Sequence, residues 1–167
     1  MNNGHPPKKP SRKGGNSSSK RRHRRRDVHE KSCGIIVFRT EADVRKFLLL
    51  HYPGGHWDFP KGHVEQKDLN EHATALRELD EETGIKTVTF VDGYREPMYY
   101  EFNRGQRERV KKVVVYFVGE TTEEGVKISF EHKGYEWLPY EQALKRLTYE
   151  NARDLLRKAA KHLNATA

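Results

Sequence analysis

The stretch Gly62–Ile85, GHVEQKDLNEHATALRELDEETGI, predicts a loop followed by an amphipathic helix. Asp68 with Glu71 three residues later has the pattern of a helix N-cap and capping box, and Gly84 is typical of a residue that ends a helix. One side of this helix is apolar, and we expect it to anchor the helix in the core. The apolar residues in question are Leu69, Leu76 and Leu79.

Three glutamates crowd the opposite side of the predicted helix. Glu78, Glu81 and Glu82 project within about 100° of one another. Like charges this close destabilise a helix, and three glutamates alone are more typical of a solvated acidic face. Arg77 is placed to pair with Glu81, and Lys61 adjoins the glycine-bearing loop before the helix. Because hard divalent cations take oxygen ligands and Mg²⁺ shares its shell with phosphates, the surroundings favour a polyphosphate site.

The same stretch resembles the Nudix box. That pattern is a glycine, a single Glu after a fixed spacing, and then, after a second fixed spacing, Arg-Glu-(aliphatic)-x-Glu-Glu-x-Gly-(aliphatic). Arg77–Ile85, RELDEETGI, fits the whole second half of that pattern, and Gly62 fits its start. The interval from Gly62 to Arg77 is one residue longer than in the family, and Asp68 stands where the single Glu would be. We place the extra residue in the loop, where an insertion costs little.

The resemblance implies an α/β fold of the Nudix type, an α/β/α sandwich with a mixed β-sheet. It also implies hydrolysis of a nucleoside diphosphate linked to another group, with Mg²⁺ or Mn²⁺ as cofactor. Which glutamate acts as general base varies within the family and stays open here. By position, the expected metal ligands are Gly62 through its carbonyl, Glu78, Glu81, Glu82 and Glu131. The expected catalytic residues are Glu78, Glu81, Glu131 and Arg77.

Beyond the box, the chain is similar to asymmetric diadenosine tetraphosphate hydrolases over roughly residues 32–163. The segments that carry this similarity are CGIIVFR, FLLLHY, HWDFPKGHVE and FEHKGYEWL, and the last of them contains Glu131. Only one of Lys111 and Lys112 can face the site, because successive strand residues point to opposite faces. The resemblance, aligned through Val114, Val115 and Tyr116, implies that this residue is Lys112. Tyr135 and one of Tyr99 or Tyr100 are candidates to enclose a purine. The expected substrate-binding residues are Tyr52, His56, Lys61, Lys112, Tyr100 and Tyr135.

Several of these residues also fit a purely structural role. Tyr99 and Tyr100 could equally pack on a core, and His56 could be a structural hydrogen-bonding residue. The charged segment EFNRGQRERV, residues 101–110, has no counterpart that we can place in the family, and it could reshape the pocket of a second nucleotide.

The resemblance implies a dinucleoside polyphosphate as substrate, with asymmetric cleavage of diadenosine tetraphosphate to ATP and AMP. An RNA with a 5′-polyphosphate or a dinucleotide cap presents the same polyphosphate and is the first alternative. The second is a Nudix module that binds a nucleotide or RNA without turnover. The intact set of Arg77, Glu78, Glu81 and Glu82 argues against this second alternative.

The charge of the chain is unevenly distributed. The formal net charge of the 167 residues is +8, but residues 1–27 contain ten Lys or Arg and one acid, so the remainder is close to neutral. We predict a disordered basic tail over residues 1–30, because a segment poor in apolar residues cannot offset its ordering entropy. Residues 31–167 are then the Nudix domain. Nucleic acid or another polyanion is a candidate partner of the tail.

Other features bound the location and assembly of the protein. The N-terminus has no apolar run typical of a signal peptide, and no later run is long enough to span a membrane. Cys33 is the only cysteine, so no intramolecular disulfide forms. We therefore expect a cytoplasmic protein without membrane contact, and we expect a monomer.

Hydrophobic patterning predicts the remaining elements. Expected strands cover residues 33–38, 46–51, 56–59, 87–94, 98–102 and 110–118, with a short one before Ser129. Expected helices cover residues 140–147 and 151–163.

Overall fold

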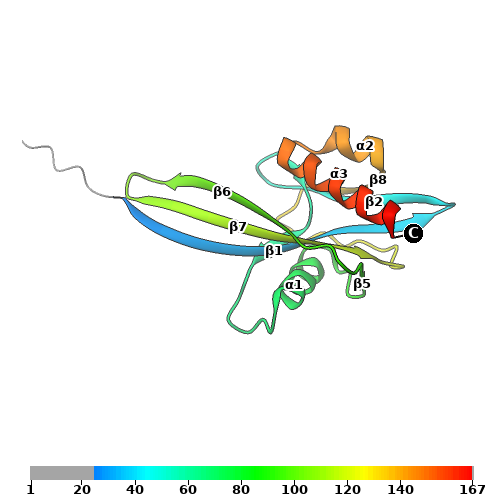
Figure 1. Ribbon diagram of the computed structural model, residues 1–167, viewed down its shortest axis with the longest axis horizontal. Helices are drawn as coiled ribbons and strands as arrows, with labels where there is room; N and C mark the ends of the chain where they lie inside the picture. The colour runs from blue at the N-terminus through cyan, green and yellow to red at the C-terminus, as the bar shows by residue number, and fades with distance from the viewer. Residues whose placement is uncertain (1–24, 167) are drawn as a thin grey trace, which may run out of the picture.

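The computed structural model describes residues 25–166, and they form a mixed β-sheet between two layers of helices (Figure 1). The strands are β1 (Arg26–Glu41), β2 (Val44–His51), β3 (Trp57–Asp58), β4 (Lys61–His63), β5 (Thr89–Phe90), β6 (Glu96–Arg104), β7 (Glu108–Glu120) and β8 (Gly134–Pro139). The helices are α1 (Glu71–Thr83), α2 (Tyr140–Arg146) and α3 (Glu150–Ala165). Central β1 pairs in parallel with β7, whereas β2 and β4 pair with it antiparallel. The expected α/β/α sandwich is confirmed.

Two cores follow from the alternation of side chains along β1. Ile36 and Phe38 face α2 and α3, whereas Ile35 and Val37 face α1. All four are buried, because each face of a central strand is covered by a helical layer. This packing fixes α1 beneath the sheet at the point where β4 joins β1.

Helix α1 begins and ends close to the predicted positions, with one different cap. The N-cap is Asn70, whose side chain accepts a hydrogen bond of 2.8 Å from the backbone N–H of residue 73, so Asp68 does not cap the helix. Gly84 ends it as predicted, with a left-handed φ of 73° that favours glycine. Leu69 lies before the helix and is 93% exposed, so its assignment to the core is wrong, whereas Leu79 is fully buried.

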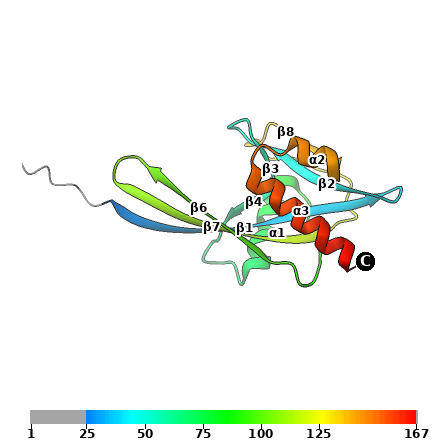
Figure 2. The same cartoon turned by 45° about the horizontal axis from the view of Figure 1, so that its top comes forward.

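Part of the sheet extends away from the helices as a three-stranded arm, visible in both ribbon views (Figures 1 and 2). We define the arm as residues 26–31 of β1, 99–104 of β6 and 108–113 of β7, which pair in register. Asp27 of the arm receives two hydrogen bonds from Arg109, at 3.0 and 2.8 Å, and pairs with Lys111. β1 thus begins five residues before the predicted domain start at Lys31. Residues 1–24 of the expected tail lie outside the described residues.

Most of the other predicted helices and strands are confirmed, and two predicted strands are not. Helices α2 and α3 confirm the two predicted C-terminal helices, and β6 and β7 contain the predicted strands 98–102 and 110–118. The strand predicted over 87–94 contains only the two residues of β5. The strand expected before Ser129 is wrong, because residues 121–129 form no strand, and β8 was not predicted. Of the helices in residues 25–166, none combines the length and apolar character needed to cross a membrane.

Candidate active site

Strand β4, which carries Gly62, is held against the acidic face of α1. In the antiparallel pairing of β4 with β1, Gly62 lies opposite Cys33, and this brings its Cα against Glu78. A Cβ added to Gly62 would overlap the carboxyl group of Glu78. A side chain here would displace the first of the expected metal-binding carboxylates, so the glycine matters for the position of Glu78 rather than for the fold.

We expect Gly62→Ala to lower kcat by about 10²-fold, because it shifts the Glu78 carboxylate by roughly the size of a methyl group. The free energy of unfolding should change little, because the atoms that the added Cβ would meet belong to the flexible end of the Glu78 side chain. Activity assays and thermal denaturation would measure both effects. Gly125→Ala is the matched control, since a Cβ at Gly125 meets no atom within 4 Å. Equal activity of the two variants would contradict the proposed packing.

Arg77 organises the acidic groups around it. Its guanidinium donates to Asp68 at 2.9 and 3.0 Å, to Glu78 at 2.9 Å and to Glu81 at 3.2 Å. It also donates to the backbone carbonyl of His63 at 2.8 Å, which ties the loop to the helix. The guanidinium holds the pKa of Asp68 well below its usual range. Asp68, which stands where the family pattern has Glu, thus anchors Arg77 rather than the helix terminus.

The carboxylates of Glu78 and Glu82 are poorly compensated within the chain. Burial raises the pKa of Glu78, although Arg77 opposes this shift. Burial also raises the pKa of Glu82 to about 8, and the nearby charges of Glu78 and Glu131 add to the effect. The positive charge of Lys61 opposes it, and the backbone N–H of Lys61 donates to Glu82 at 3.1 Å. An additional cation would let both carboxylates ionise.

The donor set fits a magnesium or manganese ion. Within residues 25–166, no three His, Cys, Asp or Glu side chains already converge as ligands. Glu81 turns to Arg77 with 54% of its side chain exposed, and Glu131 lies exposed on the surface. Mg²⁺ retains several waters and needs only one or two protein carboxylates, so Glu78 and Glu82 beside Gly62 suffice.

An aromatic and cationic cluster lies next to Glu82. The ammonium of Lys61 lies 4.3 Å from the centroid of the Tyr52 ring, which stacks on His56 at 4.8 Å. The edge of His132 meets the same ring at 4.7 Å, and its Nε2 lies 3.5 Å from Glu82. Three of the expected substrate-binding residues are therefore together, beside an acid expected to bind metal. His132 was not predicted as a site residue, although it directly follows Glu131.

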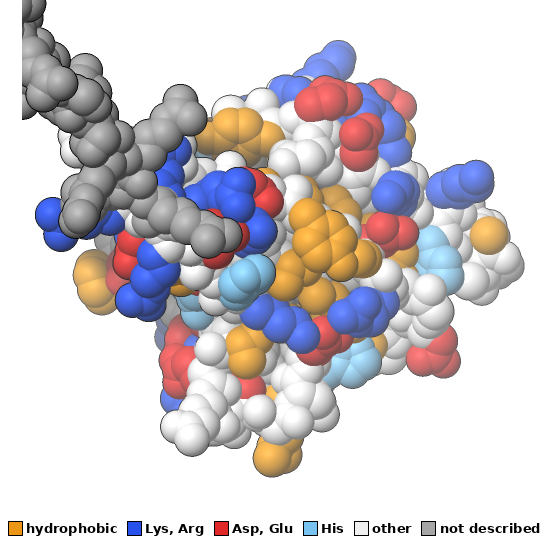
Figure 3. Space-filling model, turned by 60° about the vertical axis from the view of Figure 1, so that its left-hand side comes forward, with side chains coloured by type: hydrophobic (Ala, Val, Ile, Leu, Met, Phe, Trp, Pro, Cys, Tyr) orange, Lys and Arg blue, Asp and Glu red, His pale blue; other side chains and the backbone are white. Residues whose placement is uncertain are grey.

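A cavity of about 530 Å³ opens from this cluster toward the root of the arm. It brings together Lys61, His56, Lys112 and Tyr100 from the prediction. Burial lowers the pKa of Lys112, as expected for an ammonium whose charge is only partly compensated. The molecular surface seen from the side of the arm shows hydrophobic side chains bordered by Lys, Arg and His side chains (Figure 3). The cavity also has residues that the sequence did not indicate, namely Asp58, Met98, Phe102, Tyr149 and Asn151.

The structure does not bring Tyr100 and Tyr135 together. Tyr100 pairs with Lys112 and packs toward the core beneath α2 and α3. Tyr135 pairs with Leu50, which faces α1. Because cross-strand partners share a face, the two tyrosine rings lie on opposite faces of the sheet and cannot enclose one purine.

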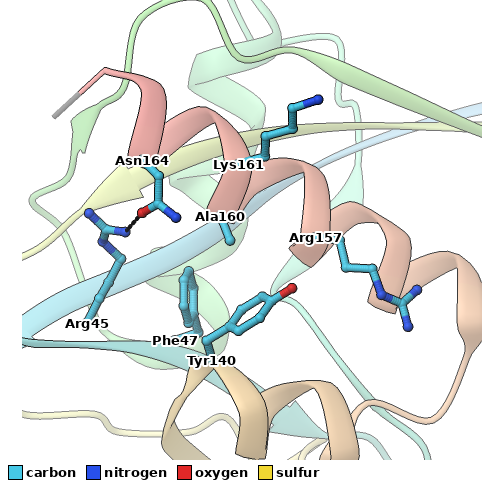
Figure 4. Close-up of a pocket in the computed structure, with 7 residues that line it drawn as sticks. All are labelled: Arg45, Phe47, Tyr140, Arg157, Ala160, Lys161 and Asn164. Atoms are coloured by element: carbon cyan, nitrogen blue, oxygen red, sulfur yellow. Dashed lines mark hydrogen bonds between the residues drawn. The ribbon is translucent and has the colours of Figure 1, made fainter.

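A second cavity of about 470 Å³ lies at the other end of α3 (Figure 4). Arg45, Arg157 and Lys161 contribute cationic side chains to it, and Arg45 donates to Asn164 at 3.4 Å. None of the residues expected to bind substrate or metal lines this cavity. Its cations are therefore useful controls for changes of charge at the candidate active site.

Comparisons with known proteins identify relatives of this chain. The NUDIX domain family matches residues 28–159. The chain is 34% identical to the asymmetrical bis(5'-nucleosyl)-tetraphosphatase of Mus musculus, over 81% of this chain and 97% of that protein. It is 33% identical to the enzyme of the same name from Caenorhabditis elegans, over 77% of this chain and 92% of that protein.

Among solved structures, a binary complex of a C. elegans Ap4A hydrolase is similar, with a TM-score of 0.72 and 31% identity. The match covers 81% of this chain and 98% of that one. The matched residues include β4, α1 and β7, which carry the acidic cluster and the cavity lysines. The chain belongs to the Nudix family and is a hydrolase of that family.

Proposed function

We propose that this chain hydrolyses dinucleoside polyphosphates with Mg²⁺ or Mn²⁺ and cleaves diadenosine tetraphosphate asymmetrically to ATP and AMP. The observation that carries the proposal is the continuous path from Glu82 through Lys61 to a cavity with Lys112 and aromatic walls. Polyphosphate needs cations and metal along its length, and a nucleoside needs an aromatic surface. The relatives from Mus musculus and Caenorhabditis elegans, which match this chain over most of their length, are named asymmetrical bis(5'-nucleosyl)-tetraphosphatases. These names support the same substrate class.

The chain's own residues divide into those that hold the metal and those that hold phosphate. Glu78 and Glu82, with the carbonyl of Gly62, would hold the cation, which when bound neutralises charge on the phosphates and helps to ionise water. Lys61 and Lys112, which both line the cavity, would bind and orient the phosphate chain, and the Lys61 ammonium pairs with Asp58 at 3.2 Å when no phosphate is bound. Tyr52 and His56 support Lys61 by cation–π contact and ring stacking.

Two further carboxylates remain as candidates for the general base. Glu81 is held by Arg77 at 3.2 Å and is more than half exposed. Glu131 is exposed, and its charge is close enough to raise the pKa of Glu82. A carboxylate near the metal-binding pair but not consumed by an ion pair is better suited to accept a proton from water. This favours Glu131 over Glu81.

His132 lies close enough to Glu82 to position it. Its Nδ1 lies 2.9 Å from the hydroxyl of Ser129, and its buried Nε2 lies 3.5 Å from Glu82 without a hydrogen bond to it. Burial lowers the pKa of His132, so the ring is neutral near pH 7. A neutral ring with its proton on Nε2 would orient the carboxylate without competing with a metal for it.

We expect Mg²⁺ binding at pH 7 to release about one proton, because metal must displace the proton from Glu82. The pKa of Glu82 is raised to about 8, so the group is mostly protonated at pH 7 in the metal-free protein. Affinity for Mg²⁺ should therefore rise with pH up to about 8 and then level off. Calorimetry in buffers of different ionisation enthalpy would count the released protons. Release of the same number from Glu82→Gln would contradict the assignment.

A substrate panel tests the proposed function against its alternatives. We expect diadenosine tetraphosphate to have a kcat/KM above those of 5′-triphosphorylated RNA and dinucleotide-capped RNA. A preference for either RNA would select the RNA pyrophosphohydrolase alternative. Tight binding of nucleotide without turnover, in Mg²⁺ and in Mn²⁺, would select the non-catalytic module. Deleting residues 1–24 would show whether the basic segment contributes to any turnover of RNA, since its contribution should be salt-sensitive.

A further inference from the structure

The cavity between β2 and α3 combines ring surface with positive charge (Figure 4). Its volume of about 470 Å³ is in the range of sites for small organic ligands. Phe47 of β2 and Tyr140 of α2 supply the ring surface, and the cations are Arg45 of β2 and Arg157 and Lys161 of α3. None of the lining residues belongs to the cavity at the candidate active site. The cavity is therefore a separate candidate site for an anion with an organic body.

The guanidinium of Arg45 is held in place with one edge unused. Its Cζ lies 5.2 Å from the centroid of the Phe38 ring, and its Nη1 donates to the side-chain carbonyl of Asn164 at 3.4 Å. Its Nε is buried and has no hydrogen-bond partner. Within residues 25–166, Nη2 donates to no acceptor and no carboxylate pairs with this guanidinium. An oxyanion bound along the Nε–Nη2 edge would accept two parallel hydrogen bonds and give the buried Nε the acceptor that it lacks.

Lys161 adds a second cation that is not neutralised, whereas Arg157 is already paired. The Lys161 side chain is exposed and forms no ion pair with a carboxylate in the described part of the chain. It lies one turn of α3 before Asn164, so it is on the side of the helix that contacts Arg45. Arg157 pairs with Glu150 at 2.7 Å and with Asp154 at 2.6 Å. The available positive charge of the cavity is therefore concentrated at Arg45 and Lys161.

We propose that this cavity is a second ligand site, which binds a nucleoside monophosphate or a ligand of the same chemistry, an aromatic ring with one phosphate. The Nε–Nη2 edge of Arg45 would bind two phosphate oxygens, and Lys161 would add a further charge-assisted contact. The ring of the ligand would lie against Tyr140. The site is independent of the proposed hydrolysis, because the two cavities share no residue.

A strand of RNA has the same phosphate and ring chemistry, but a single nucleotide fits the charges better. Strand binding needs a positive groove that follows several phosphates. Here only Arg45 and Lys161 lack a carboxylate partner among the described residues of the cavity. The exposed acids Glu150 and Asp154 lie on the same helix beside Arg157, and they would repel a continuing strand. The observations therefore favour a ligand with one phosphate.

AMP is the probe, because it has the ring and the phosphate in one molecule. Calorimetry without divalent metal should show that AMP binds at least about tenfold more tightly than adenosine or inorganic phosphate, each of which lacks one part of the contacts. Arg45→Gln should weaken AMP binding about tenfold, because a bidentate charge-assisted contact is lost. Lys161→Gln should weaken it about threefold, as the exposed ammonium contributes less. Lys158→Gln is the matched control, since Lys158 of α3 lies outside this cavity and pairs with Glu96 at 3.1 Å.

Chemical shifts of the isotope-labelled protein locate the bound AMP. We expect shifts at the Nε–H of Arg45 and at the backbone amides of Ala160 and Asn164, which line the cavity. Shifts confined to the surroundings of Lys61 would overturn the proposal, as would unchanged AMP affinity in both Arg45→Gln and Lys161→Gln, or an equal loss in Lys158→Gln. Equal affinity for inorganic phosphate would overturn the assignment of a nucleotide. Tighter binding of a short single-stranded RNA than of AMP, with the same dependence on Arg45, would overturn it in favour of RNA.

Discussion

Glu82→Gln is expected to lower kcat on diadenosine tetraphosphate by roughly 10³-fold while leaving the fold intact. Glu82 lies in a buried position at which the chain supplies only partial positive charge, chiefly from Lys61. Glutamine keeps the shape and one oxygen but loses the negative charge that would bind a cation. Steady-state assays at saturating Mg²⁺ would measure the loss.

The same variant should be more stable than the wild type when metal is absent. The pKa of Glu82 in the folded state, about 8, is above the usual value for an unfolded glutamate, so its ionisation opposes folding as pH rises between about 4.5 and 8. Glutamine has no such titration, and its advantage should grow with pH across this window. Glu124→Gln, an exposed site between β7 and β8, should change neither stability nor kcat. Wild-type turnover by Glu82→Gln would remove Glu82 from the metal site.

Arg77→Gln is expected to lower the free energy of unfolding by about 3 kcal/mol and kcat by at least about 10²-fold. The variant leaves Asp68 and Glu78 without their cation in positions where their side chains are only 4% and 15% exposed. It also releases the loop carbonyl of His63. For a chain of this size, the melting temperature should fall by roughly 6–12 °C.

Two further variants make this result specific. Arg77→Lys should recover only part of the stability, because an ammonium cannot bind several acceptors with the fixed fork of a guanidinium. Arg157→Gln on α3 is the control, since its partners Glu150 and Asp154 are both at least 60% exposed and such pairs contribute little. A melting temperature of Arg77→Gln within about 2 °C of the wild type would contradict the role of Arg77 as the organiser of the loop.

The sequence predicted the local parts of the site well. The motif Arg77–Ile85 places its charged residues by helical periodicity alone, so the ion pair of Arg77 with Glu81 and the end of the helix at Gly84 followed from spacing. The N-cap was wrong because Asp68 and Asn70 are both good capping residues, and only the position of Arg77 decides between them. Once Asp68 binds Arg77, Asn70 is left to cap the helix.

The distant parts of the site could not be predicted from local patterns. Phe102 and Tyr149 are 47 positions apart in the sequence, and nothing in either segment indicates a shared cavity. Part of the arm was not predicted either. Residues 26–30 are polar like the preceding basic segment, so they were assigned to the disordered tail. They become a strand only through pairing with β7 and through ion pairs such as Asp27 with Arg109. Of the two candidates to join Tyr135, Tyr100 lies on the other face of the sheet, whereas Tyr99 pairs with Val113 and shares the face of Tyr135. The sequence could not decide between them, because strand register decides which face a side chain occupies.

Product analysis would show whether the acidic site of α1 hydrolyses diadenosine tetraphosphate asymmetrically. Purified protein and its Glu82→Gln variant would be incubated with Mg²⁺ and diadenosine tetraphosphate, and the products separated by chromatography. We predict ATP and AMP in equal amounts from the wild type and a rate roughly 10³-fold lower from the variant. Two ADP per substrate would rule out asymmetric cleavage, and the same rate from both proteins would exclude Glu82 from the site of hydrolysis.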